Sequence, residues 1–254
     1  MSFAPSRENS ASSSILEHAA AEIAAALADL GSLVRIPGIA WPAFDQNALV
    51  RSAEAIAELA RGTGVFDEVS IKRAEIPGTN GELGQPAILA TRAARNGAPT
   101  ILLYAHHDVQ PPGDDALWQT PPFEPTVRDG RLYGRGAADD KAGVMTHIAA
   151  LRALRAAHGD DLDLGIALFV EGEEEFGSRS FAQFLADNRD ALRADVIVVA
   201  DSGNWDATTP ALTVSLRGNV KVHVRVRTLE HASHSGMFGG ACLLYTSPSP
   251  RDAT

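Results

Sequence analysis

Three apolar runs, each with the composition of a buried strand, end directly in clusters of ionisable residues. The runs are ILLYA (101–105), ALFV (167–170) and VIVVA (196–200), and the clusters that follow them are His106-His107-Asp108, the EGEEEF run at 171–176 and Asp201. In open α/β sheets, ligands bind beyond the carboxyl ends of the strands. We therefore expect imidazole and carboxylate groups to meet at one edge of a sheet.

So many carboxylates can share one edge only if cations lie among them, because like charges repel and burial of a charge is costly. A fourth cluster, GRGAADDKAG, adds Asp139 and Asp140 at the start of an expected helix, where free N–H groups favour anions. Since neither thiolates nor a basic cluster stands among these motifs, a divalent metal is the simplest cation. Two ions fit better than one, because a shared carboxylate can bridge a pair roughly 3.5 to 4 Å apart.

The elements that position these clusters follow from the spacing of apolar residues. It predicts helices at 14–30, 47–61, 141–157 and 178–187, the first opened by a capping box from Ser14 to Glu17. It predicts strands at 65–72, 87–90, 100–104, 162–170 and 196–200. Strands that alternate with helices indicate an α/β fold, with a mainly parallel sheet flanked by helices.

The spacing of apolar and polar residues changes after Pro210. The run LTVSLRGNVKVHVRVR alternates apolar and polar residues at a period of two, which predicts a half-exposed antiparallel strand. We therefore expect a domain boundary near Pro210.

Composition narrows the class of protein. The chain has 254 residues, 45% of them apolar, and a formal net charge of -10. No apolar stretch approaches the length of a membrane span, and the acidic balance argues against non-specific binding of nucleic acid. Cys242 is the only cysteine, which excludes an intramolecular disulfide and a thiolate zinc site. The first residues lack the apolar core of a signal peptide, which favours a cytoplasmic location.

Five motifs, in order along the chain, resemble a known family. They are YAHHDVQP, YGRGAADDKAG, EGEEEFGS, ADSGNW and HSGMFGG. They are similar to the carnosinase and cytosolic non-specific dipeptidase branch of the two-zinc metallopeptidases, a clan that includes glutamate carboxypeptidase, aminoacylase, acetylornithine deacetylase and succinyl-diaminopimelate desuccinylase. The resemblance implies a zinc-exopeptidase-like catalytic domain with an inserted α+β lid that forms a homodimer.

The resemblance also implies a set of metal ligands. His106 and Asp201 match ligands of one zinc, Glu175 matches a ligand of the second, and Asp139 matches the carboxylate that bridges the two. It further implies a cis peptide bond between Asp139 and Asp140. Because His and carboxylate ligands suit several ions, Mn²⁺ or Co²⁺ could replace Zn²⁺.

Three further residues match positions with catalytic roles in this family. Asp108 would hold the imidazole of His106 in the right tautomer. Glu174 would be the general base, which takes a proton from the attacking water and passes it to the leaving amine. His234 would reach the active site of a partner subunit and stabilise the oxyanion.

Other polar residues near the motifs have ordinary interpretations. We expect Glu171 and Glu173 at the rim of the site or in support of its ligands, Lys141 in a local ion pair, and Trp205 either in the pocket or outside it. Arg217-Gly218 is as compatible with a structural as with a functional role. The histidines expected at the surface or on helix faces are His147, His158, His223 and His231.

The motifs divide the chain into four expected segments. Residues 1–13 form a disordered lead-in, 14–210 a catalytic domain without its C-terminal part, and 211–241 the start of the lid. Residues 242–254 resemble the translation of a DNA-library adapter and are expected to be non-native. A last histidine ligand would lie further along in the family, so we expect the fragment itself to be inactive.

The sequence therefore predicts zinc-dependent hydrolysis of an amide bond in dipeptides or small peptides. An N-acyl-amino-acid deacylase of the same family is the alternative. A non-catalytic metal-binding or interaction domain is the alternative from another class. The preferred substrate side chains and the identity of the metal stay open.

Overall fold

The computed structural model describes residues 7–206, 208–220 and 222–225. The chain divides into two compact units, Met1–Ala211 and Leu212–Thr254. The division falls near Pro210, where the spacing of apolar and polar residues changes, whereas the identity of the second unit as the start of a lid stays a prediction. Among the described residues, no helix combines the length and the apolar character needed to span a membrane.

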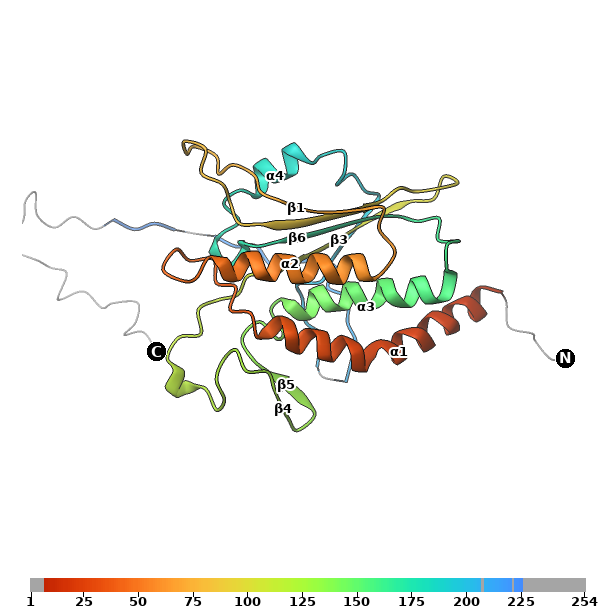
Figure 1. Cartoon of the computed structure of the whole chain (residues 1–254), viewed down its shortest axis with the longest axis horizontal. Helices are drawn as coiled ribbons and strands as arrows, with labels where there is room; N and C mark the ends of the chain where they lie inside the picture. Colours follow the sequence, from red (N-terminus) through yellow and green to blue (C-terminus); the bar gives the residue numbers. More distant parts are fainter. Residues whose placement is uncertain (1–6, 207, 221, 226–254) are drawn as a thin grey trace, which may run out of the picture. The chain divides into compact units, whose positions relative to one another are not determined.

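The first unit is built on a five-stranded sheet with the order β1-β2-β6-β3-β7 (Figure 1). Its strands are β1 (Glu68–Lys72), β2 (Ala87–Arg92), β3 (Thr100–His106), β6 (Gly165–Glu171) and β7 (Val196–Val199). The strands β4 (Thr126–Arg128) and β5 (Arg131–Tyr133) form a separate hairpin. Its turn lies at Asp129 and Gly130, which both adopt positive φ angles.

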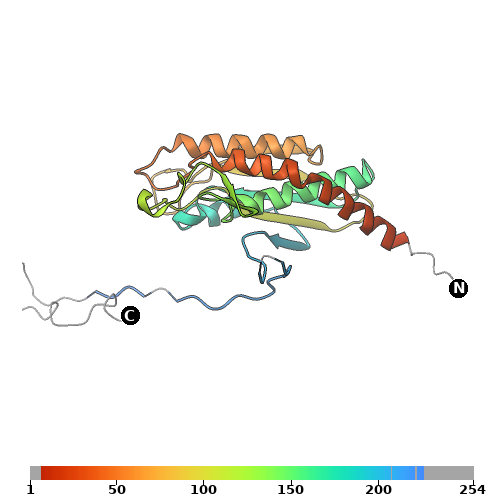
Figure 2. The ribbon, with the colours of Figure 1, turned by 90° about the horizontal axis from the view of Figure 1, so that it is seen from below.

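Helices cover both faces of the sheet. The helices α1 (Arg7–Val34), α2 (Asn47–Gly62) and α3 (Lys141–His158) lie on one face and α4 (Phe181–Asp187) lies on the other (Figure 1). Figure 2 shows the first three helices running along the same side of the sheet. Successive residues of β6 serve the two cores: Leu168 packs with the α1–α3 layer and Phe169 stacks on Phe184 of α4. This alternation is the normal consequence of strand geometry.

The α/β class is confirmed, and the sheet is mixed: β1, β3, β6 and β7 run in one direction and β2 runs against them. Strand β3 runs parallel to β6 and to β7, whereas β2 runs antiparallel to β1 and to β6. The segments 73–86 and 93–99 contain no helix, and a parallel pair requires a longer crossover. The chain therefore reverses direction at each of these two connections.

Several element boundaries differ from the sequence-based expectation. Helix α1 begins at Arg7, so the capping box at Ser14 lies inside the helix and the expected lead-in over 1–13 is partly helical. Helix α4 begins at Phe181 rather than at residue 178. Strand β6 begins at Gly165, three residues later than expected.

The strand expected after Pro210 does not form in the part of the chain that the structure describes. Residues 211–220 and 222–225 carry no strand, and Val214 is 92% exposed. A strand is stable only when its N–H and C=O groups pair with a neighbour. The described residues of this unit offer no such partner, so the alternating pattern alone does not produce a strand here.

Lys141, at the start of α3, is fully buried and anchors α1. Its Nζ donates to the carbonyl oxygens of Leu33 (2.9 Å) and Ile36 (2.7 Å). Helix α1 ends at Val34, and cations stabilise the free carbonyls at such an end. The expected ion pair is therefore wrong: the ammonium group binds two carbonyl oxygens.

His147, in the middle of α3, is also buried, with 4% of its surface exposed. Its Nε2 lies 2.9 Å from the carbonyl oxygen of Tyr104 in β3. Burial lowers the pKa of the His147 imidazole, and the hydrogen bond to Tyr104 opposes the effect only in part. Of the two expected positions, His147 takes a helix face rather than the surface, and the neutral ring fastens α3 to the central strand.

A buried neutral histidine makes folding sensitive to acid. The unfolded chain binds a proton at His147 below its ordinary pKa of about 6.5, whereas the folded chain resists protonation. The stability that neutral His147 contributes is therefore fully present above about pH 6.5, and it is lost as the pH drops below that value. We expect the unfolding free energy to fall more steeply in the wild type than in His147→Gln, by up to about 1.4 kcal/mol per pH unit.

Urea titrations at about pH 7, 6 and 5 measure this difference. His107, whose pKa burial lowers to about 4, is present in both proteins and cancels in the comparison. Parallel pH profiles for the two proteins would contradict the prediction.

Candidate metal centre

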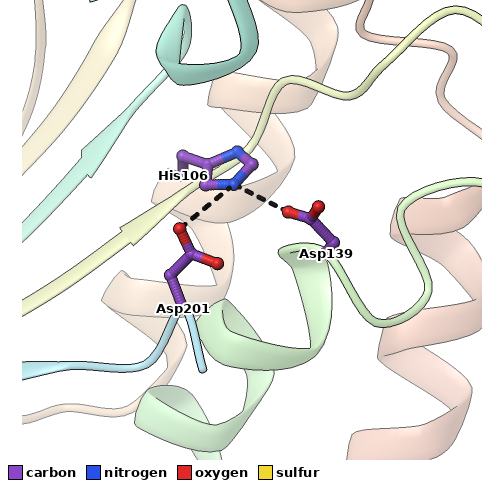
Figure 3. A group of neighbouring side chains, drawn as sticks. All are labelled: His106, Asp139 and Asp201. Carbon is purple, nitrogen blue, oxygen red and sulfur yellow. Dashed lines mark hydrogen bonds and ion pairs between the residues drawn. The ribbon is translucent and has the colours of Figure 1, made fainter. Parts of the chain in front are cut away.

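The imidazole of His106 lies at the centre of the acidic cluster. Its Nε2 is 3.0 Å from Asp139 Oδ1 and 3.8 Å from Asp201 Oδ2 (Figure 3). The side chain of His106 is fully buried, whereas that of Asp139 is 66% exposed and that of Asp201 36% exposed. One ligand atom from each of the three residues lies within 4.8 Å of the others.

The sheet explains why residues so far apart in the sequence meet here. His106 is the last residue of β3, and Asp201 follows β7, the parallel neighbour of β3. Parallel strands end at the same edge of a sheet, which brings the two residues together. Asp139 lies in the loop before α3, and the peptide bond that joins it to Asp140 is cis, as the family resemblance implies.

The electrostatics of this edge favour a positive charge at His106. Burial works to lower the pKa of its imidazole, but Asp108 and the charges of Asp140 and Asp201 outweigh burial and raise the pKa to about 10. Carboxylates therefore make this site attractive to a cation, whether a proton or a metal ion.

The donor set fits a divalent metal. One imidazole nitrogen and two carboxylate oxygens converge from His106, Asp139 and Asp201, and such ligands suit zinc, manganese and cobalt. The other ring nitrogen of His106, Nδ1, lies 3.1 Å from the carbonyl oxygen of Asp108. In a neutral ring this contact holds the proton on Nδ1 and leaves Nε2 free as a ligand, as in most metal-binding histidines.

Asp108 joins the histidine to the glutamate run. Its carboxylate lies 3.4 Å from His106 Nδ1, so its backbone oxygen, rather than its side chain, makes the shorter contact to the ring. The same carboxylate accepts hydrogen bonds from the backbone N–H groups of Glu174 (3.0 Å) and Glu175 (3.1 Å). Asp108 therefore positions two motifs at once, a role that the sequence did not reveal.

Glu174 faces the histidine. Its Oε2 is 3.9 Å from His106 Nε2, and its side chain is 39% exposed. Burial raises the pKa of Glu174, the charge of His106 opposes this, and Glu175 and Asp201 add to the rise. A carboxylate with a raised pKa at the edge of a metal site is suited to accept and release protons.

Glu175 is not a member of the group around His106. It accepts a hydrogen bond from Gln110 Nε2 (2.5 Å). Burial raises its pKa, the hydrogen bond from Gln110 lowers it, and the negative charge of Asp139 raises it again. The assignment of Glu175 to a second ion stays a prediction.

Glu171 and Glu173 are buried, so the interpretation of either as a rim residue is wrong. Glu171 accepts hydrogen bonds from the hydroxyl groups of Tyr104 and Ser178. Burial raises the pKa of Glu171 to about 7, against the effect of these two hydrogen bonds. Both glutamates support the loop from inside rather than facing solvent.

Of four other residues singled out from the motifs, one lies outside the described part of the chain and three are exposed. His234 lies outside the described residues, so its role stays a prediction. Trp205 is 84% exposed. Arg217 and Gly218 are exposed in the second unit.

The supporting roles of three further residues are visible only in the structure. Gln110 stands two residues after Asp108 in the HHDVQP motif, and this position in the motif could have indicated its role. Asp140 is buried and its Oδ2 accepts the backbone N–H of His106 (3.0 Å). Burial raises the pKa of Asp140 to about 7, while the N–H of His106 and its charge oppose the rise. Gly143 allows close contact between α3 and this carboxylate, and nothing in its sequence context indicates that.

Comparison with known proteins identifies the family. The model of the peptidase family M20/M25/M40 matches residues 102–238, which is more than half of the chain. The chain belongs to this family. The match includes the candidate metal ligands His106, Asp139 and Asp201 and the glutamate run.

The relatives of this M20/M25/M40 chain include named dipeptidases. It is 44% identical over 155 residues to a cysteinylglycine-S-conjugate dipeptidase of Corynebacterium striatum, a match that covers 61% of this chain and 34% of that protein. It is 34% identical over 211 residues to a mouse (Mus musculus) beta-Ala-His dipeptidase, covering 82% and 42% of the two chains. The chain therefore spans less than half the length of these relatives.

Solved structures show the same fold. Human carnosine dipeptidase 1 superposes with a TM-score of 0.63 at 28% identity, over 75% of this chain and 41% of the other. The dipeptidase Dug1p of Saccharomyces cerevisiae superposes with a TM-score of 0.71 at 23% identity, over 90% and 49%. The described sheet and helices of the M20/M25/M40 chain therefore have a dipeptidase-like arrangement.

Gly143 offers a test of how tightly the metal site is built. A Cβ atom there would overlap the carboxylate of Asp140 and lie 2.8 Å from the carbonyl oxygen of Ala200, next to Asp201. Gly143→Ala should therefore displace Asp140 or the chain at Ala200. We expect zinc affinity to fall by about 10- to 100-fold and stability to fall by about 1–3 kcal/mol.

Calorimetric zinc titration and thermal unfolding of this chain measure the two effects. Gly62→Ala is the matched control, because a Cβ atom at Gly62 meets nothing within 4 Å. Equal zinc affinities in Gly143→Ala and the wild type would show that the close approach does not set the site.

Proposed function

We propose that this M20/M25/M40 chain is the metal-binding part of a metallopeptidase that hydrolyses the amide bond of dipeptides. The observation that carries the proposal is the convergence of His106, Asp139 and Asp201 within 4.8 Å, with Glu174 3.9 Å from the imidazole. The site thus pairs a metal-binding group with a carboxylate that can move protons. Relatives named as dipeptidases support the choice of substrate class.

In this proposal the residues divide between holding metal and moving protons. His106, Asp139 and Asp201 would hold one ion, and Asp139 and Glu175 would hold a second. Such ions would supply polarisation of the scissile carbonyl and a more acidic water molecule. The carboxylate of Glu174 accepts a proton from the attacking water and delivers it to the amide nitrogen as the C–N bond breaks.

The finer parts of the proposal rest on the sequence resemblance. They comprise zinc as the ion, with manganese or cobalt as substitutes, and a homodimer in which His234 of one subunit stabilises the oxyanion in the other. A cytoplasmic location, which does not rest on the resemblance, also stays a prediction of the sequence. Asp108 supports the site by holding His106 and the backbone of Glu174.

Replacement of Glu174 by glutamine tests the mechanism. Gln keeps the size of the side chain but cannot accept a proton from water, so kcat should fall by about 100- to 10,000-fold. KM should change little, because the metal ligands stay in place. The assay uses a form of the protein as long as its relatives, since the present chain spans less than half of their length.

Hydrolysis of Cys-Gly and β-Ala-His, with and without a chelator, provides the measurement. Glu82→Gln, which alters an exposed carboxylate paired with Arg179, is the control. Cleavage of acetylated or succinylated amino acids without cleavage of dipeptides would instead identify a deacylase. Zinc binding without chelator-sensitive hydrolysis would support a non-catalytic metal-binding domain.

A further inference from the structure

We propose that Glu173 is a positioning residue that fixes the place of Glu174 and Glu175 at the metal centre. Its catalytic meaning rests on the proposed function, but the positioning itself does not. The site needs such a residue because Glu174 and Glu175 lie in a loop with a single 3₁₀ turn, Glu174–Phe176, and both side chains are partly exposed. Side chains on a loop are held accurately only when its backbone is fixed.

The carboxylate of Glu173 is buried and has three hydrogen-bond donors. Its Oε1 accepts from the backbone N–H of Ser180 (2.5 Å) and from the hydroxyl of Ser180 (2.6 Å). Its Oε2 accepts from the backbone N–H of Gln85 (3.1 Å). Only 4% of the residue is exposed, so these donors compensate for the water that burial removes. The Glu173 carboxylate therefore links Ser180, just before α4, to Gln85 in the loop before β2.

The backbone of Glu173 closes the same turn. Its carbonyl oxygen accepts from the N–H groups of Phe176 (3.1 Å) and Ser178 (2.8 Å). Gly177 and Ser178 adopt positive φ angles of 91° and 48°, which bend the chain back towards Glu173. The backbone carbonyl of Glu173 therefore closes the turn from Glu173 to Ser178, and Glu174 and Glu175 lie within that turn.

A second set of contacts holds the loop before β2 against this turn. Gln85 Nε2 donates to Gln46 Oε1 (2.7 Å), and Gln46 Nε2 donates to the carbonyl oxygens of Trp41 (2.8 Å) and Phe44 (3.0 Å). The ring of Trp41 packs on that of Phe176, with centroids 5.2 Å apart. The donor at Gln85 is therefore itself fixed in place.

Gly84 shows how close this approach is. A Cβ atom at Gly84 would overlap the Ser180 hydroxyl and lie 2.9 Å from Glu173 Oε1. Only a residue without a side chain lets the loop reach the carboxylate.

The turn is thus held from two sides. Asp108 accepts the backbone N–H groups of Glu174 and Glu175, and Glu173 ties the turn to Ser180 and Gln85. Two buried carboxylates, neither of which is proposed as a metal ligand, fix the peptide units that carry the proton-transfer carboxylate and the second proposed ligand.

Glu173→Gln tests the inference with little change in size. A carboxylate can only accept hydrogen bonds, whereas an amide presents one NH₂ group that must face either Gln85 N–H or the Ser180 donors. Amide hydrogen exchange in this chain, followed by NMR, should accelerate about tenfold or more at Glu174, Glu175 and Ser180. Amides of α2 and β2 should keep their wild-type rates.

Two further variants frame this measurement. Ser180→Ala removes only the hydroxyl donor and should give a smaller acceleration at the same amides. Glu82→Gln, in the same pair of loops but exposed and paired with Arg179, should change none of them. Wild-type rates at Glu174 and Glu175 in Glu173→Gln, or equal acceleration of all amides through global unfolding, would overturn the proposal.

Turnover separates this inference from the proposed function. In a form as long as its relatives, Glu173→Gln should lower kcat more than it changes KM, because the base is displaced while the metal ligands stay in place. If exchange accelerates locally but the wild-type protein hydrolyses no dipeptide, the proposed function fails and the positioning role stands. If hydrolysis is present and exchange at the turn is unchanged in Glu173→Gln, the positioning role fails alone.

Discussion

The arrangement at the edge of the sheet depends on one electrostatic constraint: a fully buried imidazole is surrounded by carboxylates. Burial alone would drive His106 to the neutral form, yet Asp108, Asp140 and Asp201 reverse that tendency and raise its pKa to about 10. A group of side chains with this balance attracts positive charge. The topology maintains it, because the parallel strands β3 and β7 end side by side and deliver His106 and Asp201 to one place.

The acidic residues of this edge fall into two groups. Asp139 and Glu174 keep much of their surface exposed and face His106. Asp108, Asp140 and Glu173 are buried or nearly so and accept backbone N–H groups. Hydrogen bonds to charged acceptors are stronger than those between neutral groups, so the buried carboxylates fix the backbone that carries the exposed ones. The density of acidic residues is therefore partly a scaffold and only partly a binding site.

The sequence was sufficient to predict where the His106 and carboxylate cluster lies. It was not sufficient to show which buried residues hold that cluster in place. Apolar runs that end in polar residues predict that His106 and Asp201 meet, because the carboxyl ends of parallel strands coincide. The buried state of Glu173 depends on Ser180 and on Gln85, 88 positions away in the chain, and a single sequence does not show such a pairing. The same limit explains Lys141 and His147, whose partners are backbone carbonyls of α1 and β3. The alternation after Pro210 failed as a strand signal because pairing needs a neighbour as well as a pattern.

The geometry of the proposed metal centre depends on the close approach of the α3 backbone as much as on the ligands themselves. Glycine in the first turn of α3 costs about 1 kcal/mol in helix propensity relative to alanine, yet Gly143 lets the helix come into contact with the Asp140 carboxylate and the Ala200 carbonyl. Asp140 in turn holds the backbone of His106, and Ala200 directly precedes Asp201. One small residue thus links the positions of two proposed ligands at the ends of different strands. Helix stability is given up where the spacing of the ligands requires it, which is the pattern expected of a site selected for geometry rather than for the stability of its elements.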